Sequence, residues 1–331
     1  MIHDTIDHRM PATGVSDDAT MPTFVRMPAR GVLGVGGPDA REFLQNLVSN
    51  DIQRLDGSHA LYALLLTAQG KFLFDFFLAE ATSAPPGVSI VADCEGPRAA
   101  DLLRRLTLYR LHANVTLADV GQHYAVAAVF GGDAAARIGL HADAGSAARF
   151  ANGVAFVDPR MPELGARVIA PATELEAALA GAGLRLGAPD AYERLRLALG
   201  VPDGSRDLLV DKTFPLEGGL DDLHAIDYDK GCYVGQELTA RTHYRGTIRK
   251  RLFRVDVEGP LPAPGTEITF GGVAAGEMRS GAGARGIAML RLEHVDEAER
   301  TSAPFAAGGS TLRAVRPPWF ARTPATAPPQ S

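Results

Sequence analysis

The chain reads Lys230-Gly231-Cys232-Tyr233-Val234-Gly235-Gln236-Glu237 at its most distinctive point, where one of its only two cysteines lies between two glycines. A thiolate forms most easily where positive charge and the start of a helix lie near a partly exposed cysteine. Lys230 supplies a cation two positions from Cys232, and residues 236–241 are typical of a helix start whose unpaired N–H groups could point toward the sulfur. Cys232 is therefore predicted to be a reactive or metal-ligating thiol. The alternative is a small buried residue in a tight turn, with Gly231 and Gly235 present only for their backbone angles.

Size and composition are those of an ordinary globular protein. The 331 residues allow two or three domains, and hydrophobic residues make up 46% of the chain. The net charge of −6 argues against a protein whose whole surface coats nucleic acid or anionic membrane. Cys94 and Cys232 lie too far apart to suggest a secreted disulfide framework. They also cannot hold an iron–sulfur cluster unaided, because such clusters usually take four protein ligands, so we expect no metal held by this chain alone.

The two ends of the chain differ from its middle. Residues 1–22 are polar and lack an apolar signal core, which predicts a disordered leader on a cytoplasmic protein. Residues 321–331 are rich in proline and alanine and are predicted to be a disordered tail. No apolar run approaches the roughly 20 residues of a membrane span, so no membrane partner is expected.

Hydrophobic patterns predict α+β units in the first two thirds of the chain. The glycines of 34–37 suggest a dinucleotide-binding loop, but Asp39 stands where its third glycine should be, and Pro38 is typical of the first turn of a helix over 38–47. We therefore reject a dinucleotide site. Other elements are predicted as strands over 59–67, 71–79, 88–94, 115–120 and 124–130, and as helices over 97–106, 173–179 and 190–199, the last capped by Asp190.

Asp75 interrupts the second of these strands among four phenylalanines. A carboxylate there is costly to bury unless something pairs with it, and burial would raise its pKa. Asp75 is therefore a candidate ligand-contacting acid, and an outward-facing residue on an edge strand is the alternative. Cys94, in contrast, is predicted to pack in the core.

The last third of the chain changes to short alternating strands separated by glycine and proline, the rhythm of a small antiparallel barrel or sandwich. Trp319 is expected to anchor the end of this domain. The predicted organisation is a leader over 1–22, a first α+β unit over 23–120 completed by 205–250, a second unit over 121–204, a barrel domain over 251–320 and a tail over 321–331.

The eight residues around Cys232 resemble the signature of the YgfZ family, folate-binding proteins linked to the maintenance of iron–sulfur enzymes and structurally related to the aminomethyltransferase (T-protein) of glycine cleavage. Residues 43–52 and 61–78 are similar to the first folate-domain segment of the aminomethyltransferases, and Asp158-Pro159-Arg160 to another segment of the same family. The resemblance implies two α+β units around a central pocket, closed by a C-terminal barrel-like domain. It also implies that Asp75 faces the pterin of tetrahydrofolate or a derivative.

Further site residues follow from the resemblance and the spacing around the motif. Tyr233, Gln236 and Glu237 are candidate folate-binding residues. Arg241 and Arg245 lie four apart, on one face of the expected helix, where they could meet a folate glutamate tail or a phosphate. The alternative is a solvated charged surface that contributes little.

Two departures from the aminomethyltransferases argue against a role in glycine cleavage. Ala198 replaces a glutamate that helps to hold the pterin in that group, and residues 232–235 replace a segment that tends to read Asp-Phe-Ile-Gly. The leading hypothesis is an accessory protein that binds reduced folate and supports iron–sulfur assembly proteins or client enzymes, with Cys232 and Asp75 as the reactive groups. The alternatives are a folate-dependent one-carbon transferase, and a tRNA-modification factor that binds tRNA through the basic run 241–251.

Overall fold

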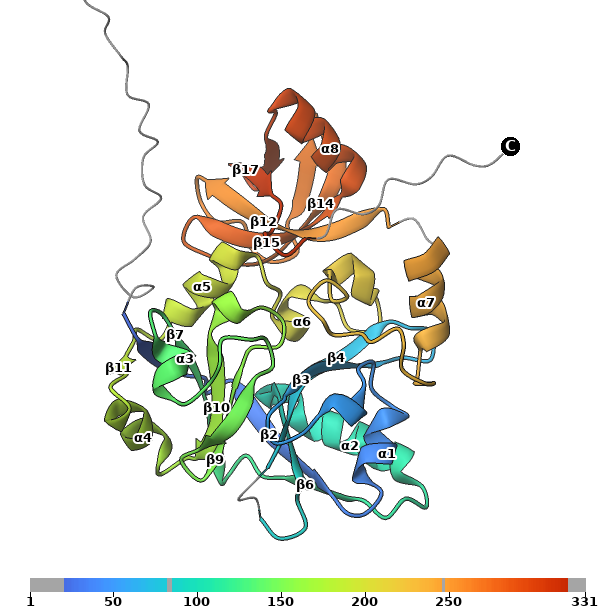
Figure 1. Ribbon diagram of the computed structural model, residues 1–331. Helices are drawn as coiled ribbons and strands as arrows, with labels where there is room; N and C mark the ends of the chain where they lie inside the picture. Colours follow the sequence, from blue (N-terminus) through green and yellow to red (C-terminus); the bar gives the residue numbers. More distant parts are fainter. Residues whose placement is uncertain (1–20, 82–84, 246–247, 321–331) are drawn as a thin grey trace, which may run out of the picture.

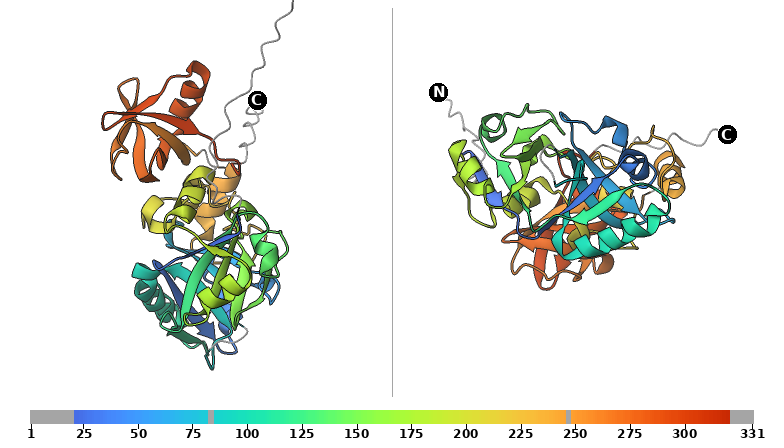
Figure 2. Two further views of the ribbon diagram at one scale, coloured as in Figure 1. Left: turned by 90° about the vertical axis from the view of Figure 1, so that its left-hand side faces the viewer. Right: turned by 90° about the horizontal axis from the view of Figure 1, so that it is seen from below.

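The computed structural model describes residues 21–81, 85–245 and 248–320. The predicted tail, and the predicted leader up to residue 20, lie outside this part of the chain. Two sheets stand at one end of the molecule, one of them antiparallel and the other antiparallel except for one parallel edge pair. A closed six-stranded barrel stands at the other end, with α5 (Ala191–Leu199), α6 (Gly204–Asp207) and α7 (Gln236–Arg245) between them (Figures 1 and 2).

The first sheet has the strand order β3-β4-β5-β2-β6 and carries α1 (Ala40–Gln45) and α2 (Ala99–Arg110) on its outer face. Along β3 the side chains alternate strictly, since Tyr62, Leu64 and Leu66 face the centre of the molecule while Leu61, Ala63 and Leu65 face the helices. Both faces are therefore buried, which explains the continuous apolar runs in the sequence. The strands are β2 (Arg30–Gly36), β3 (Leu61–Leu66), β4 (Phe72–Glu80), β5 (Ile90–Glu95) and β6 (Thr116–Asp119).

The second sheet has the order β11-β1-β7-β10-β9-β8 and packs α3 (Ala134–Arg137) and α4 (Leu175–Gly181) on its outer face. Its inner residues, such as Val126, Ala128 and Phe156, share one core with the inner residues of the first sheet. The strands are β1 (Thr23–Arg26), β7 (Tyr124–Phe130), β8 (Ala147–Phe150), β9 (Gly153–Val157), β10 (Ala166–Pro171) and β11 (Arg185–Leu186).

Two predictions need correction. The first unit was predicted to begin at residue 23, but β1 pairs with β7 and β11, so its hydrogen bonds place it in the second sheet. Asp190 stands at the start of α5 without capping it, because its carboxylate pairs with Arg194 one turn on. The dinucleotide site is rightly rejected, since β2 pairs antiparallel with both of its neighbours.

The barrel has the order β12-β15-β14-β13-β16-β17 and encloses its own core around Phe253, Ile268 and Leu290. It contains a helix that the sequence analysis missed, α8. Trp319 fixes the end of the barrel segment to α5, because its indole N–H donates to the Leu199 carbonyl at 3.0 Å. The elements are β12 (Lys250–Glu258), β13 (Glu267–Phe270), β14 (Val273–Ala282), β15 (Arg285–Arg291), α8 (Leu292–Thr301), β16 (Phe305–Ala307) and β17 (Ser310–Val315).

Candidate functional site

The loop that carries Cys232 is fixed at its beginning by Lys230. Its ammonium group donates to three backbone carbonyls at and beyond the end of α1, those of Gln45 at 2.9 Å, Val48 at 2.6 Å and Asn50 at 2.7 Å. Burial lowers the pKa of Lys230 to about 8. The sequence places this cation where it could activate the thiol, but its hydrogen bonds point to carbonyls at and beyond the end of α1, so its visible role is to hold the loop in place.

The end of the loop is fixed by Gly235. Its φ of +84° favours glycine, and a Cβ there would lie 2.4 Å from the Thr67 carbonyl oxygen in the turn between β3 and β4. The Gln236 side-chain oxygen accepts the Tyr233 backbone N–H at 3.0 Å, and α7 starts at Gln236. Gly231 is different, because a Cβ there would meet nothing within 4 Å. Only Gly235 is therefore required by the local backbone.

The two cysteines lie in opposite environments. Cys232 is exposed at the surface between the two fixed points of its loop. Cys94 is 3% exposed, and its thiol donates to the Gly31 carbonyl at 3.6 Å. Burial disfavours the thiolate and raises the pKa of Cys94 to about 12. The prediction that Cys94 packs in the core is confirmed. A deeply buried Cys232, the alternative reading of the motif, is wrong.

Asp75 lies in the interior, 3% exposed, on the face of β4 that looks toward the second sheet. Its Oδ2 accepts the Tyr62 hydroxyl at 2.9 Å, while its Oδ1 is buried without a hydrogen-bond partner among the described residues. Burial raises the pKa of Asp75, against the opposing charge of Arg30. A Cβ on Gly204 would stand 2.4 Å from a Glu95 carboxylate oxygen and 3.0 Å from Asp75 Oδ1, so only glycine fits where α6 begins against these two acids. The predicted burial is confirmed and the outward-facing alternative is wrong.

A chain of buried ion pairs joins the two sheets beneath Asp75. Asp93 accepts from Arg30 at 2.6 Å and from Arg167 at 2.8 Å, across 74 residues of sequence. Asp158 accepts from Arg160 at 2.8 Å and from Arg167 at 3.4 Å. Burial alone would raise the pKa of Asp158, but the two arginines outweigh it and lower the pKa. The Asp158-Pro159-Arg160 segment, noted in the sequence for its family resemblance, thus crosslinks the interior.

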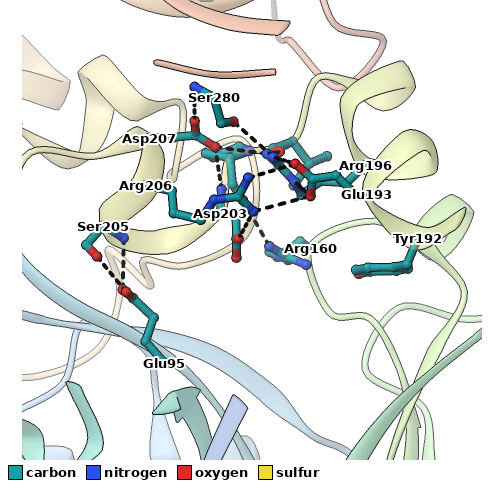
Figure 3. Close-up of polar contacts among 12 residues, drawn as sticks. Glu95, Arg160, Tyr192, Glu193, Arg196, Asp203, Ser205, Arg206, Asp207 and Ser280 are labelled. Atoms are coloured by element: carbon teal, nitrogen blue, oxygen red, sulfur yellow. Dashed lines mark hydrogen bonds and ion pairs between the residues drawn. The ribbon is translucent and has the colours of Figure 1, made fainter. Parts of the chain in front are cut away.

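A second polar network joins α5 and α6 to the barrel (Figure 3). Asp207 accepts from Arg196 at 2.8 Å and from the Ser280 backbone N–H at 3.0 Å. Ser205 donates its hydroxyl to Glu95 at 2.5 Å, which extends the contacts to the first sheet. No local sequence pattern predicts this network, because its pairs join α5 to β14, far apart in the chain.

The structure does not bring the two predicted reactive groups together. Cys232 is exposed at the surface, whereas Asp75 is 3% exposed in the interior, five residues beyond the Gly70 on which Gly235 packs. Tyr233 is half-buried, with the Lys230 ammonium 5.2 Å from its ring centre.

The predicted anion-binding residues lie on α7. Arg241 is exposed and pairs with Glu237 at 2.9 Å. Arg245 lies within α7, and its side chain is outside the described part. Arg251, at the end of the basic run, is buried and pairs with Asp222 at 2.6 Å. Much of the charge of the basic run is therefore balanced within the chain.

Among the residues that the structure describes, no group of three or more histidines, cysteines or acids is placed to hold a metal ion. In the same part of the chain, every helix is too short or too polar to cross a membrane.

Comparison with known proteins places this geometry in a family. Residues 249–322 match the family described as the CAF17 C-terminal β-barrel domain. The chain is 33% identical over 305 residues to the iron–sulfur cluster assembly factor IBA57, mitochondrial, of Mus musculus, covering 86% of this chain and 80% of the relative. It is 34% identical to the human protein of the same name, covering 82% and 78%.

A solved structure shows the same fold. The glycine cleavage system aminomethyltransferase T from Bartonella henselae superposes with a TM-score of 0.70 over 91% of this chain and 87% of its own, at 17% identity. The predicted α+β architecture with a C-terminal barrel is confirmed. At this identity the likeness establishes the fold alone.

Proposed function

This chain belongs to the family of iron–sulfur cluster assembly factors that includes IBA57, and from this membership we propose that its exposed Cys232 thiol completes a cluster centre together with another protein. The thiol loses its proton to solvent, and the sulfur then binds one iron of a cluster whose remaining ligands come from the partner. The cluster is the cargo of this reaction. The partners are assembly proteins or client enzymes.

The contrast between the two cysteines carries this proposal. An iron–sulfur cluster usually takes four protein thiolates, and this chain has two cysteines, of which only Cys232 is exposed. The surrounding loop supports a presenting role, because Lys230 and Gly235 fix it on both sides of the sulfur. A thiol held in this way loses little conformational freedom when a partner docks.

We also propose that the chain binds tetrahydrofolate or a derivative beside Asp75. The proposal is supported by the buried Oδ1 of Asp75, which lacks a hydrogen-bond partner among the described residues. Such a carboxyl group could hold a proton for a ring nitrogen of a bound pterin. Ala198 offers no acid to the pterin, so binding would depend on Asp75 more than in the aminomethyltransferases.

A folate-dependent transferase is a second candidate function. The raised pKa of buried Asp75 favours it, since a group that holds and releases a proton suits chemistry at a folate nitrogen. The exposure of Cys232 and the burial of Asp75 argue against direct cooperation of the two groups. Turnover of a methylene-folate donor by purified protein would establish this function. The basic run favours tRNA binding less, because Arg241 and Arg251 already pair with acids.

The test of the thiol combines chemistry and genetics. Iodoacetamide should alkylate Cys232 in the native protein and Cys94 only after unfolding. In a bacterial strain deleted for its own relative, Cys232→Ser should fail to restore iron–sulfur enzyme activity, and the matched Cys94→Ala variant should restore it. Full restoration by Cys232→Ser would remove the proposed role of the thiol.

The folate proposal has a separate test. Tetrahydrofolate should bind the wild type at least about tenfold more tightly than Asp75→Asn, a difference of about 1.4 kcal/mol. Equal affinities would remove Asp75 from the binding site. The proposed cytoplasmic location can be checked by fractionating the source cells.

A further inference from the structure

A groove beside α2 combines exposed aliphatic side chains with arginines. It is a cavity of about 310 Å³, between α2, the start of β4 and the loop that follows α6. We call it the α2 groove and define it by Leu73, Phe74, Arg104, Arg105, Leu108 and Val210. It lies apart from the interior around Asp75, because Leu73 and Phe74 point to the other face of β4.

The apolar part of the α2 groove is unusually exposed. Leu108 is 67% exposed and Val210 36%, and Leu111, the residue that follows the end of α2, is 83% exposed. These three account for a large share of the exposed bulky apolar side chains in the described part, which number eight. Scattered apolar side chains are ordinary on a protein surface, but a cluster of them marks a contact surface.

The charged part of the groove contains an arginine side chain that forms no ion pair among the described residues. Residues spaced three and four apart share one face of a helix, so Arg104, Arg105 and Leu108 lie together on α2. Arg104 pairs with Asp101 at 2.8 Å. Arg105 and the exposed Arg110 have no ion-pair partner within the described ranges. This positive helix stands out on a chain of net charge −6.

The α2 groove is close to the Cys232 loop. The loop rests on Gly70 through Gly235, and the groove begins at Leu73 and Phe74 on the strand that follows. Three or four residues of the chain separate Gly70 from these two side chains of the groove. The segment before the loop is tied to the same strand, since the Phe72 backbone N–H donates to the Thr213 carbonyl at 2.9 Å. A protein that reaches the thiol can therefore cover the groove as well.

We propose that the α2 groove docks an acidic, amphipathic segment of the protein that shares the cluster with Cys232. Carboxylates of the segment pair with Arg105 and Arg110, and its apolar side chains cover Leu108, Leu111 and Val210. A nucleic acid fits less well, because it requires free aromatic or continuous basic surface. The aromatic ring in the groove, that of Phe74, is not free for base stacking, because the Arg98 guanidinium carbon lies over it, 4.1 Å from the ring centre. This inference rests on the proposed function of Cys232.

The test uses three probes on the full-length chain. They are a synthetic helical peptide with glutamates on one face and leucines on the other, an isomer with the same composition in scrambled order, and an oligouridylate. Fluorescence anisotropy should show that the amphipathic peptide binds and that salt weakens its binding. The scrambled isomer should bind at least tenfold more weakly. Equal binding of the isomer, or tighter binding of the oligouridylate, would overturn the proposal.

Variants locate the binding on the surface. Leu108→Asp and Arg105→Glu should each weaken the amphipathic peptide at least tenfold, and a peptide with lysines in place of the glutamates should recover binding to Arg105→Glu. Val273→Asp and Arg291→Glu alter exposed residues of the barrel and should change nothing. Unchanged binding by Leu108→Asp would overturn the site. All four positions are exposed, so unfolding is not expected to confound the comparison.

Failure of this inference is distinguishable from failure of the proposed function. Cys232→Ser should bind the peptide like the wild type while losing cluster-dependent activity. If Leu108→Asp retains full activity in the deletion strain, the docking role is wrong and the role of the thiol is unaffected. If Cys232→Ser is fully active, the role of the thiol is wrong, and with it the identity of the docked partner.

Discussion

Replacing Lys230 by methionine tests whether this residue holds the Cys232 loop in place. Methionine has a similar length, so it removes the ammonium group and leaves the carbonyls of Gln45, Val48 and Asn50 without their donor. A hydrogen bond to a charged group contributes about 1.5–3 kcal/mol. The three bonds share one charge and water reaches the half-buried site, so we expect a total loss of about 2–3 kcal/mol rather than their sum.

The assay for Lys230→Met is urea unfolding combined with hydrogen exchange. The free energy of unfolding should fall by the amount above, and backbone N–H groups in 46–50 and 228–234 should exchange faster than in the wild type. Lys250→Met is the matched control, because Lys250 is exposed and has only a 3.6 Å contact with Glu217. A loss below about 0.5 kcal/mol with unchanged exchange would refute the anchoring role of Lys230.

The difference in stability between the wild type and Lys230→Met should depend on pH, and the direction of the change follows from the pKa of Lys230. Burial lowers the pKa of Lys230 to about 8, whereas an unfolded lysine has a pKa of about 10.4. Between these values the unfolded state binds more protons, so the stability of the wild type relative to Lys230→Met should rise with pH. Below about pH 8 the difference should be flat. Since the ammonium is partly solvated, we expect a total rise of about 1–2 kcal/mol.

The remaining predictions concern the interior and the loop. Asp75→Asn should be more stable than the wild type at pH 7 by about 1–2 kcal/mol, because burial raises the pKa of Asp75; urea unfolding should show the gap closing as the pH falls toward 4. Asp93→Asn should cost about 3–5 kcal/mol in the same assay, since it leaves Arg30 and Arg167 buried without their shared carboxylate. Gly235→Ala should lower the free energy of unfolding by about 1–3 kcal/mol, because the backbone φ is positive and the new Cβ would clash with the Thr67 carbonyl oxygen. Equal thermal stability of Gly235→Ala and Gly231→Ala would contradict this explanation.

Much of the scaffold could be predicted from local patterns. The apolar runs around Tyr62 and Phe77 predict strands. The carboxylate among phenylalanines leaves both a buried and an outward-facing Asp75 open, and the family resemblance favours the buried one that the structure has. The different environments of Cys94 and Cys232 also follow from their neighbours in sequence. In each case the residues that decide the outcome lie within a few positions of one another.

The features that could not be predicted depend on pairing across the chain. Strand β1 has four residues, and nothing in them distinguishes the first sheet from the second. The Asp93 carboxylate meets Arg167 only after both sheets have formed. Lys230 was expected to serve the sulfur next to it, but the carbonyls it contacts come from a segment 180 or more residues away. Helix α8 was missed because the surrounding strands dominate the pattern of the barrel segment.

The most direct test of the central claim is the cluster that this chain retains with a partner. Purified wild type and Cys232→Ser would each be mixed with an assembly protein loaded with an iron–sulfur cluster, and the complex would be re-isolated for iron and acid-labile sulfide analysis. The wild type should yield a complex that contains iron and sulfide, and Cys232→Ser should yield none. Equal cluster content in the two complexes would contradict the claim that this thiol is the ligand that the chain contributes.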